Sequence, residues 1–121
     1  MSVDIVTLSE KFAKLKTQNE YRTIAQMNNY QFKLIRMNRE FIWHAHEDTD
    51  ETFFVVDGEM EIALRDKTLR LKANDLVVIP KGVEHKPKSI GECRLMLIEP
   101  AGTLNTGNAG GRLTDTRGDW I

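Results

Sequence analysis

The chain has little of what would tie it to a membrane, to nucleic acid or to an oxidising compartment. Its longest apolar runs, such as LVVI at residues 76–79, are far too short to span a bilayer, and its N-terminus lacks the basic and then apolar pattern of a secretion signal. The 17 basic and 18 acidic residues leave a net charge of −1, which gives no support for a nucleic-acid or polyanionic partner. The one cysteine, Cys93, cannot form an internal disulfide, and it lies in a strand-like run as a small core residue would. We therefore expect a cytoplasmic protein with no nucleic-acid or membrane partner.

The length and the apolar pattern predict one domain, residues 1–121, built almost wholly from strands. TLSEKFAKLK, at residues 7–16, carries the one helical pattern of apolar side chains. Short strand-like runs with turn signals every eight to twelve residues predict an all-β sandwich or barrel with a core at about residues 23–100. The expected strands are TIAQM, YQFKLIRM, EFIWHAH, ETFFVV, EMEIAL, TLRLK, DLVVI and CRLMLIE. Asp57-Gly58 predicts a tight hairpin between two of them, and residues 101–121 form an irregular tail whose last residues, Trp120 and Ile121, we expect to dock.

The three histidines of the chain all stand in settings typical of metal ligands. His44 and His46 are two positions apart in a predicted strand, so their imidazoles face the same side. His85 follows the tight corner IPKGVE, which can aim a third imidazole at them. The stretch HAHEDTDE offers a carboxylate as anionic ligand, which a pair of imidazoles commonly recruits for a divalent metal. On this evidence the carboxylate is any of four: Glu47, Asp48, Asp50 and Glu51.

Two blocks of sequence resemble the motifs of the cupin family. Residues 38–58 resemble the first motif, Gly-x5-His-x-His-x4-Glu-x6-Gly, and residues 74–85 resemble the second, Gly-x5-Pro-x-Gly-x2-His. Asn38 and Asn74 occupy the glycine positions, where asparagine keeps a turn feasible because it tolerates positive φ. Ser89 replaces an asparagine that often closes the second motif.

The resemblance implies a double-stranded β-helix, a jelly-roll β-barrel with one metal inside, and it implies His44, His46, Glu51 and His85 as ligands. Three imidazoles and a carboxylate suit iron, manganese, nickel, cobalt, copper or zinc. Four protein ligands leave two positions of a six-coordinate sphere open for substrate or dioxygen. Because imidazole binds metal only when neutral, we expect metal loss near pH 6.5 and below.

Strand alternation predicts which side chains surround this site. It places Ile42, Phe53 and Val55 inside with the ligands, and it adds Met96, and Arg36 if the alternation continues past Asn38. These side chains describe a mostly apolar pocket for a small organic molecule. Apolar residues also occupy the opposite faces of the same strands, as with Phe41, Trp43 and Ala45 or Phe54 and Val56. Strands apolar on both faces need cover on both, so we expect a homodimer; the alternative is that the first thirty residues fold back over the outer face.

Three functions remain open at this stage. The first is a metal-dependent enzyme of dioxygenase or isomerase type that acts on a small molecule inside the barrel, with Glu51 available as a base. The second is a non-catalytic barrel that binds or senses a small molecule. The third, from the resemblance alone, is a sugar-phosphate isomerase.

Overall fold

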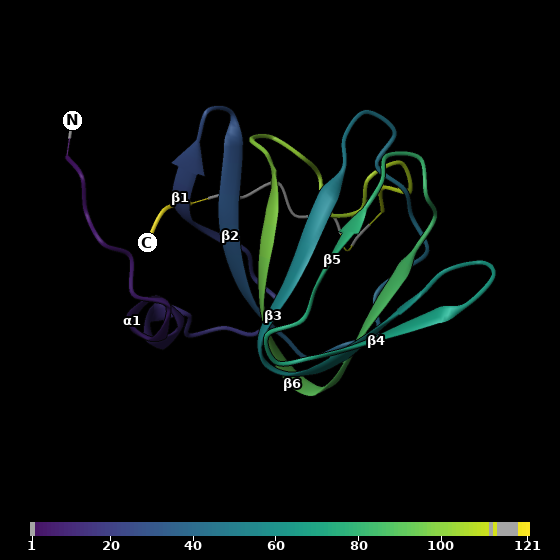
Figure 1. Ribbon diagram of the computed structural model, residues 1–121, viewed down its shortest axis with the longest axis horizontal. Coiled ribbons are helices and arrows are strands. Elements are labelled where there is room, and N and C mark those ends of the chain that lie inside the picture. Colours follow the sequence, from purple (N-terminus) through teal and green to yellow (C-terminus); the bar gives the residue numbers. More distant parts are fainter. Residues whose placement is uncertain (1, 112, 114–118) are drawn as a thin grey trace.

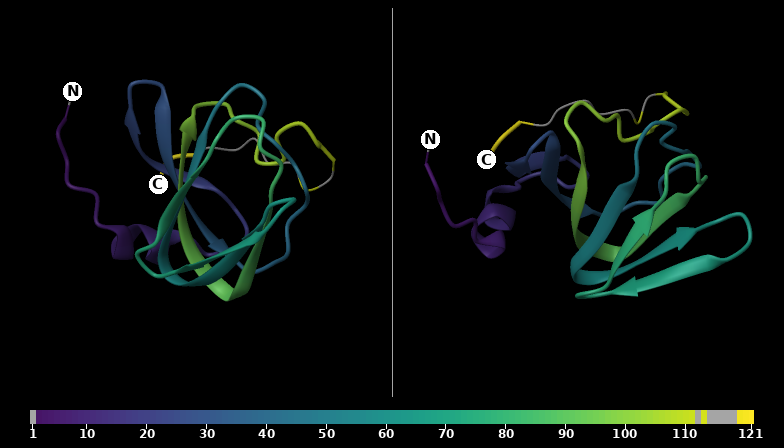
Figure 2. Two further views of the ribbon diagram at one scale, coloured as in Figure 1. Left: turned by 45° about the vertical axis from the view of Figure 1, so that its right-hand side comes forward. Right: turned by 45° about the horizontal axis from the view of Figure 1, so that its top comes forward.

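The two longest strands organise the fold. In the computed structural model, which describes residues 2–111, 113 and 119–121, one six-stranded antiparallel sheet curls into a barrel with a short helix beside it (Figures 1 and 2). The elements are α1 (Leu8–Lys14), β1 (Arg22–Met27), β2 (Tyr30–Met37), β3 (Glu51–Ala63), β4 (Thr68–Lys72), β5 (Leu76–Ile79) and β6 (Lys86–Pro100). The expected jelly-roll fold is confirmed. None of the helices formed by the described residues is long and apolar enough to cross a membrane.

Strand order follows from the length of β3 and β6. The sheet runs β1-β2-β6-β3-β4, and β5 pairs with the start of β3. β6 pairs with β2 along one edge and with nearly all of β3 along the other. The first half of β3 pairs with β5 and the second half pairs with β4, so this one strand has two different neighbours along the same edge. The candidate metal ligand Glu51 therefore stands at the very start of the central strand.

The predicted hairpin at Asp57-Gly58 is wrong. β3 continues through these residues and keeps its pairing with β6, with register shifts between Val55 and Asp57 and between Asp57 and Glu59. Gly58 has a φ of +87°, and a Cβ atom on it would lie 2.7 Å from the carbonyl oxygen of Glu92. The Asp-Gly pair thus forms a bulge that bends one long strand rather than a turn that joins two.

The predicted strand EFIWHAH is also absent. Residues 38–50 form no regular strand and make only isolated bridges, Glu40 with Lys88 and His44 with His85. Alternation of side chains therefore breaks down along this segment. Asparagine was expected to stand in for glycine in both motifs because it tolerates positive φ. Asn74 in the second motif does so, with a φ of +73°, whereas Asn38 in the first motif is not among the residues with positive φ.

Two apolar clusters lie on opposite faces of the sheet. The interior cluster fills the barrel and consists of Ile35, Met37, Phe41, Phe53, Val55, Met60, Ile62, Leu71, Ile79, Cys93, Leu95 and Leu97. The outer cluster consists of Phe12, Leu15, Ile24 and Leu34, with Val56, Met96 and Ile121 against it. Phe12 comes from α1, so the N-terminal segment covers part of the outer face. This agrees with the alternative to a homodimer, in which the first thirty residues fold back over that face.

The C-terminal residues add to this cover. The amide of Thr23 donates to the carbonyl of Asp119 at 2.9 Å, and the amide of Ile121 donates to the carbonyl of Thr23 at 3.1 Å. Both ends of the chain therefore lie on the β1 side of the barrel (Figure 1). The docking expected from Trp120 and Ile121 agrees with these contacts, although Trp120 itself is largely exposed.

Candidate metal centre

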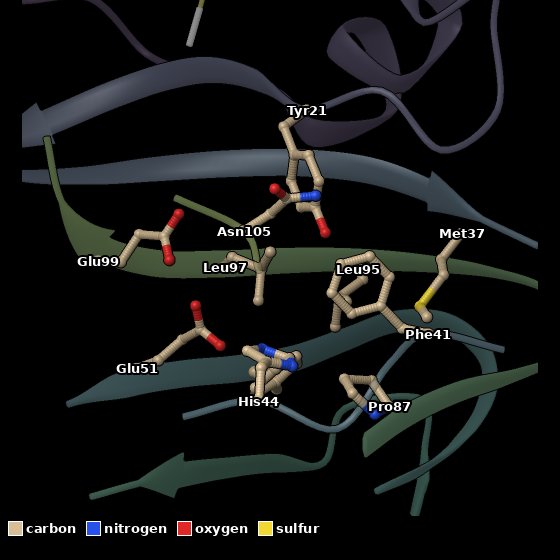
Figure 3. Close-up of a pocket in the computed structure, with 11 residues that line it drawn as sticks. Tyr21, Met37, Phe41, His44, Glu51, Pro87, Leu95, Leu97, Glu99 and Asn105 are labelled. Carbon is tan, nitrogen blue, oxygen red and sulfur yellow. The ribbon is translucent and has the colours of Figure 1, made fainter. Parts of the chain in front are cut away.

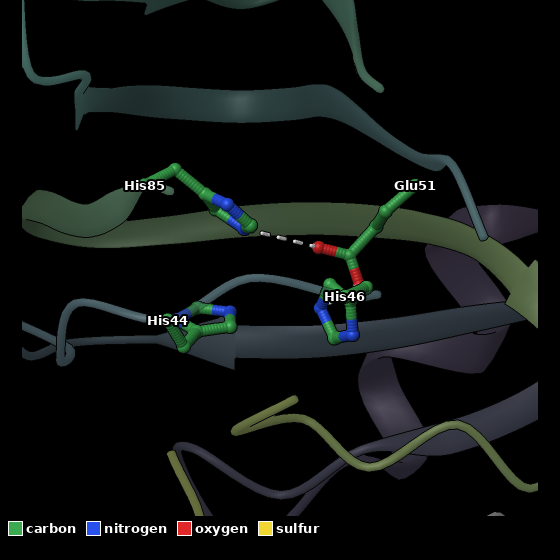
Figure 4. A group of neighbouring side chains, drawn as sticks. All are labelled: His44, His46, Glu51 and His85. Atoms are coloured by element: carbon green, nitrogen blue, oxygen red, sulfur yellow. Dashed lines mark ion pairs between the residues drawn. The ribbon is translucent and has the colours of Figure 1, made fainter. Parts of the chain in front are cut away.

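Four side chains from three separate segments meet inside the barrel (Figure 4). They are His44 and His46 from the irregular segment, Glu51 from the start of β3, and His85 from the corner before β6. All four are buried, and one potential ligand atom of each lies within 4.8 Å of the other three. The sequence prediction therefore grouped residues that the fold brings together.

Backbone hydrogen bonds hold these segments in register. His44 and His85 form a bridge in which the amide of each donates to the carbonyl of the other, at 3.0 and 2.9 Å. The amide of Gly82 donates to the carbonyl of His46 at 2.8 Å. The second motif is thus fastened to the first at both of its histidines, which replaces the strand that the sequence predicted there.

The orientation of two imidazoles is fixed by carbonyl groups close by in the chain. Nδ1 of His44 lies 2.8 Å from the carbonyl oxygen of Ile42, and Nδ1 of His85 lies 2.9 Å from that of Val83. A carbonyl oxygen only accepts, so Nδ1 carries the proton in both rings and Nε2 keeps its lone pair. A histidine that binds a metal through one ring nitrogen usually donates a hydrogen bond from the other, which fixes the orientation of the ring.

The three Nε2 atoms are the unusual feature of the site. They are buried and have no hydrogen-bond partner among the described residues. Nε2 of His46 lies 3.2 Å from Oε2 of Glu51, and Nε2 of His85 lies 3.7 Å from Oε1 (Figure 4). Buried polar atoms are nearly always satisfied in folded proteins. A cation among these nitrogens and the carboxylate would satisfy all of them, so the residues present fit a divalent transition metal.

The electrostatics of the site favour the protonation states that a cation needs. Burial lowers the pKa of His44 to about 4, so this ring is neutral well below pH 6.5. Burial by itself raises the pKa of Glu51, but the hydrogen bond with Glu99 and the nearby imidazoles of His46 and His85 outweigh it and lower the pKa below its ordinary value. The site therefore presents an anionic carboxylate beside a neutral imidazole.

The other carboxylates of HAHEDTDE point elsewhere. Glu47, Asp48 and Asp50 are exposed. Oδ1 of Asp50 accepts a hydrogen bond from the amide of Lys81, and Oε1 of Glu47 accepts one from the Asn108 side chain. These contacts shape the surface loop, so Glu51 is the acidic residue of this stretch that faces the histidines.

A small cavity adjoins the centre (Figure 3). It offers about 20 Å³ to the centres of water-sized groups, which is room for one or two of them. His44 and Glu51 border it together with Tyr21, Met37, Phe41, Phe53, Pro87, Leu95, Leu97, Glu99 and Asn105. On the other side of His46 a wider surface cleft of about 320 Å³ runs between residues 46–49 and 103–108. The centre thus lies between an inner cavity and an open approach.

The predicted pocket residues fall into three groups. Phe53 lines the cavity, whereas Val55 and Ile42 pack into or against the interior cluster without lining it. Met96 and Arg36 do not agree with the prediction. Met96 packs against the outer cluster, because the inward positions of β6 are Leu95 and Leu97. Arg36 likewise turns outward, where Nη2 donates to Glu92 at 2.7 Å and Nη1 donates to the carbonyl of Leu15 at 2.9 Å.

The lining residues that were not predicted include Tyr21, Phe41, Glu99 and Asn105. Phe41 was assigned to the outer face by an alternation that the segment does not follow. Glu99 carried a usable signal, because it shares the inward positions of β6 with Leu95 and Leu97. Tyr21 and Asn105 come from irregular segments, where no periodicity shows which way a side chain points.

The fold and the centre together define a class, the small jelly-roll barrel with a candidate metal site of three histidines and one glutamate inside. The comparison with known families gives the class its name. The cupin domain family model matches residues 34–99, more than half of the chain, and the protein belongs to this family.

Individual relatives agree with this assignment. A cupin-2 domain protein of solved structure from Shewanella frigidimarina is 48% identical, with a TM-score of 0.77 over 79% of this chain and 94% of its own. The solved structure of protein NMB1881 from Neisseria meningitidis is 28% identical, with a TM-score of 0.73 over 80% of this chain and 99% of its own. The uncharacterized protein YdbB of Bacillus subtilis is 39% identical over 77 residues, which cover 63% of this chain and 68% of that protein.

Proposed function

We propose that the protein is a metal-dependent enzyme that acts on a small organic molecule inside the barrel. One divalent transition metal is held by His44, His46, Glu51 and His85. The observation that supports this most directly is the convergence of three buried, unpartnered Nε2 atoms on one carboxylate. Iron, manganese, nickel, cobalt, copper and zinc all suit this donor set.

Different residues of the chain have different roles at such a site. A metal bound there supplies a Lewis acid for an oxygen atom of the substrate, as oxygenase and isomerase chemistry requires. Ile42 and Val83 hold the rings of His44 and His85 through their carbonyl oxygens, which keeps each Nε2 directed at the centre. Phe53 and other apolar side chains of the interior cluster give the cavity a largely non-polar wall. Glu51 is the anionic group beside the centre and is positioned to accept a proton.

A second candidate is a barrel that binds or senses a small molecule without converting it. The small size of the inner cavity favours it, because the space beside the centre suits a compact ligand without leaving obvious room for a co-substrate. The sugar-phosphate isomerase alternative has less support. Among the described residues, those that line the cavity include no lysine or arginine to hold a phosphate.

We further propose that the protein works in the cytoplasm as a homodimer, with residues 1–121 as one domain. Apolar side chains at the surface support the dimer: Leu76 and Val78 on β5 are 61% and 49% exposed, and Val3 and Ile5 in the N-terminal arm are almost fully exposed. Sedimentation of the purified protein is expected to show a dimer at micromolar concentration. A monomer across the whole range contradicts this part of the proposal.

Elemental analysis of protein purified without an affinity tag tests the metal. We expect one metal ion per chain, and little or none in the His44→Ala and His85→Ala variants. Asp48→Ala is the matched control, since Asp48 is exposed and belongs to the same stretch. Unchanged metal content in the histidine variants contradicts the assignment.

Oxygen uptake and product formation with enolisable and catechol-like compounds then test turnover. A metal-loaded protein that binds such compounds but never consumes them favours the binding barrel over the enzyme.

A further inference from the structure

The inner cavity has two polar walls that face each other across apolar side chains. His44, Glu51 and Glu99 form the near wall, on the side of the metal centre, where Glu99 is hydrogen-bonded to Glu51. The far wall is formed by Tyr21 and Asn105, which lie on the opposite side of the cavity from His44 and Glu51 in Figure 3. An enclosure with polar groups at opposite ends and apolar sides is the usual form of a site that orients a small ligand.

Glu99 is held by other groups of the protein beside the metal centre. The residue is 2% exposed, and its Oε1 lies 3.1 Å from Nζ of the buried Lys33. Burial and a hydrogen bond with Glu51 raise the pKa of Glu99 well above its ordinary value. The polar contacts of Glu99 are therefore with the protein, so a donor for a second ligand oxygen has to come from the far wall.

Tyr21 provides the group best suited to a ligand oxygen. The Arg39 guanidinium interacts with the Tyr21 hydroxyl, and a guanidinium only donates hydrogen bonds. The hydroxyl oxygen is then the acceptor, which leaves the O–H of Tyr21 to donate into the cavity that it lines. Burial also raises the pKa of Tyr21 above its ordinary value, so the hydroxyl keeps its proton.

The two walls come from different parts of the chain. The near wall lies within residues 34–99, which match the cupin family model. Tyr21 and Asn105 lie outside that range, one before β1 and the other after β6. The flanking segments of this chain thus complete a cavity whose metal side is built by the shared motifs. Selectivity for one substrate over another is then a property of the flanks.

We propose that the far wall is a substrate subsite in which Tyr21 donates a hydrogen bond to a second oxygen group of the ligand. The inference rests on the proposed metal centre and names the ligand class: a short molecule with a carboxylate or enolate oxygen at the near wall and a hydroxyl or carbonyl oxygen at the far wall. The cavity has room for one or two water-sized groups, so only the end of the ligand that carries the second oxygen enters it.

The test uses cobalt-loaded full-length protein and two matched pairs of acids. The pairs are propionate with 3-hydroxypropionate and butyrate with 4-hydroxybutyrate, and each pair differs by one hydroxyl group. Binding is followed by the visible absorption of cobalt, first in the unchanged protein and then in Tyr21→Phe. Tyr30→Phe is the control, because Tyr30 is the other tyrosine of the chain and lies exposed at the start of β2.

We expect at least one hydroxy acid to bind about 5- to 10-fold more tightly than its partner, the range of one neutral hydrogen bond. The preference disappears in Tyr21→Phe and persists in Tyr30→Phe, while cobalt content is unchanged in both. A preference that survives in Tyr21→Phe, or no preference in the unchanged protein, overturns the subsite but leaves the metal centre intact. Failure of the unchanged protein to bind cobalt overturns the proposed function, and the subsite falls with it.

A second measurement does not depend on the stability of Tyr21→Phe. In Tyr30→Phe, the ring signal of ¹³C-labelled tyrosine comes from Tyr21 alone. In zinc-loaded protein this signal is expected to shift with the hydroxy acid and to stay in place with its partner. Equal shifts with both acids contradict a hydrogen bond from Tyr21.

Discussion

Gly107 lies so close to Ala45 that a Cβ atom on Gly107 would come within 2.2 Å of the Ala45 carbonyl oxygen and 3.2 Å of Nδ1 of His46. The next residue, Asn108, accepts a hydrogen bond from the amide of Ala45 at its side chain and donates one from its own amide to the Ala45 carbonyl. The C-terminal segment is therefore fastened to the irregular segment that carries two candidate ligands, His44 and His46.

The first prediction is that Gly107→Ala weakens metal binding, because the added methyl group must push this segment away from His46. Loss of such support around a ligand typically lowers metal affinity about 10- to 100-fold. Competition with a chromophoric chelator measures the change. Gly110→Ala is the control, since Gly110 also has a positive φ but a Cβ atom there would meet nothing within 4 Å. Equal affinities of the two variants contradict the prediction.

A second pair of glycines tests the bulge in β3. Gly58→Ala and Gly91→Ala both place a side chain at positive φ, which costs about 1–2 kcal/mol. Only Gly58→Ala also forces a Cβ atom against the backbone of Glu92. We expect its free energy of unfolding to fall by a further 1–3 kcal/mol or so, the usual range for overpacking. Urea denaturation measures both, and equal losses show that the close approach is not rigid.

The buried pair of Lys33 and Glu99 leads to the third prediction. Lys33→Met leaves the buried Glu99 carboxyl group without its hydrogen-bonding cation, which is expected to lower the free energy of unfolding by about 1–3 kcal/mol. The double variant Lys33→Met/Glu99→Leu recovers part of the loss, because no unpaired polar group remains buried there. Glu84→Gln, which breaks an exposed pair with Arg65, costs less than about 1 kcal/mol. A Lys33→Met protein as stable as the Glu84→Gln protein contradicts the prediction.

Cys93 gives a prediction on pH. Burial raises the pKa of its thiol to about 11 from 9.0, so the folded state holds the proton more tightly than the unfolded state. This contribution to stability is complete below pH 9 and is lost as the pH rises towards 11. We expect iodoacetamide to modify Cys93 at pH 8 only in step with unfolding by urea. Cys93→Ala removes this alkaline loss of stability. Modification at the same rate in folded and unfolded protein shows that the thiol is accessible.

The sequence predicted which four side chains lie together better than it predicted the strands that carry them. The three histidines stood out because imidazole is a common metal ligand and all three lie in suitable settings. The resemblance to the cupin motifs then singled out Glu51 among the four carboxylates. Strand alternation failed where the backbone left regular geometry, which is why Phe41 lies inside rather than outside. The Asp57-Gly58 pair failed for a related reason: a local turn preference does not reveal that the next residues will pair with β6.

The sequence could not predict the far wall for a different reason. Tyr21 and Asn105 lie in irregular segments, where side chains follow no regular alternation, so tertiary contacts alone determine that these two side chains point into the cavity. The apolar outer face was read correctly as needing cover, but part of that cover comes from α1 and the C-terminal residues. Alternation can show that a face is apolar without showing which segment lies on it.

The carbonyl groups behind His44 and His85 determine how the centre receives a metal. Since Nδ1 of each ring already holds its proton against a carbonyl, the lone pairs on Nε2 are in place before any ion arrives. Neither ring has to change tautomer when a metal enters. The Ile42 and Val83 carbonyls lie in the same chain segments as the rings they orient, so a chain that has folded without metal is already prepared for it, and loading can follow synthesis at any later time.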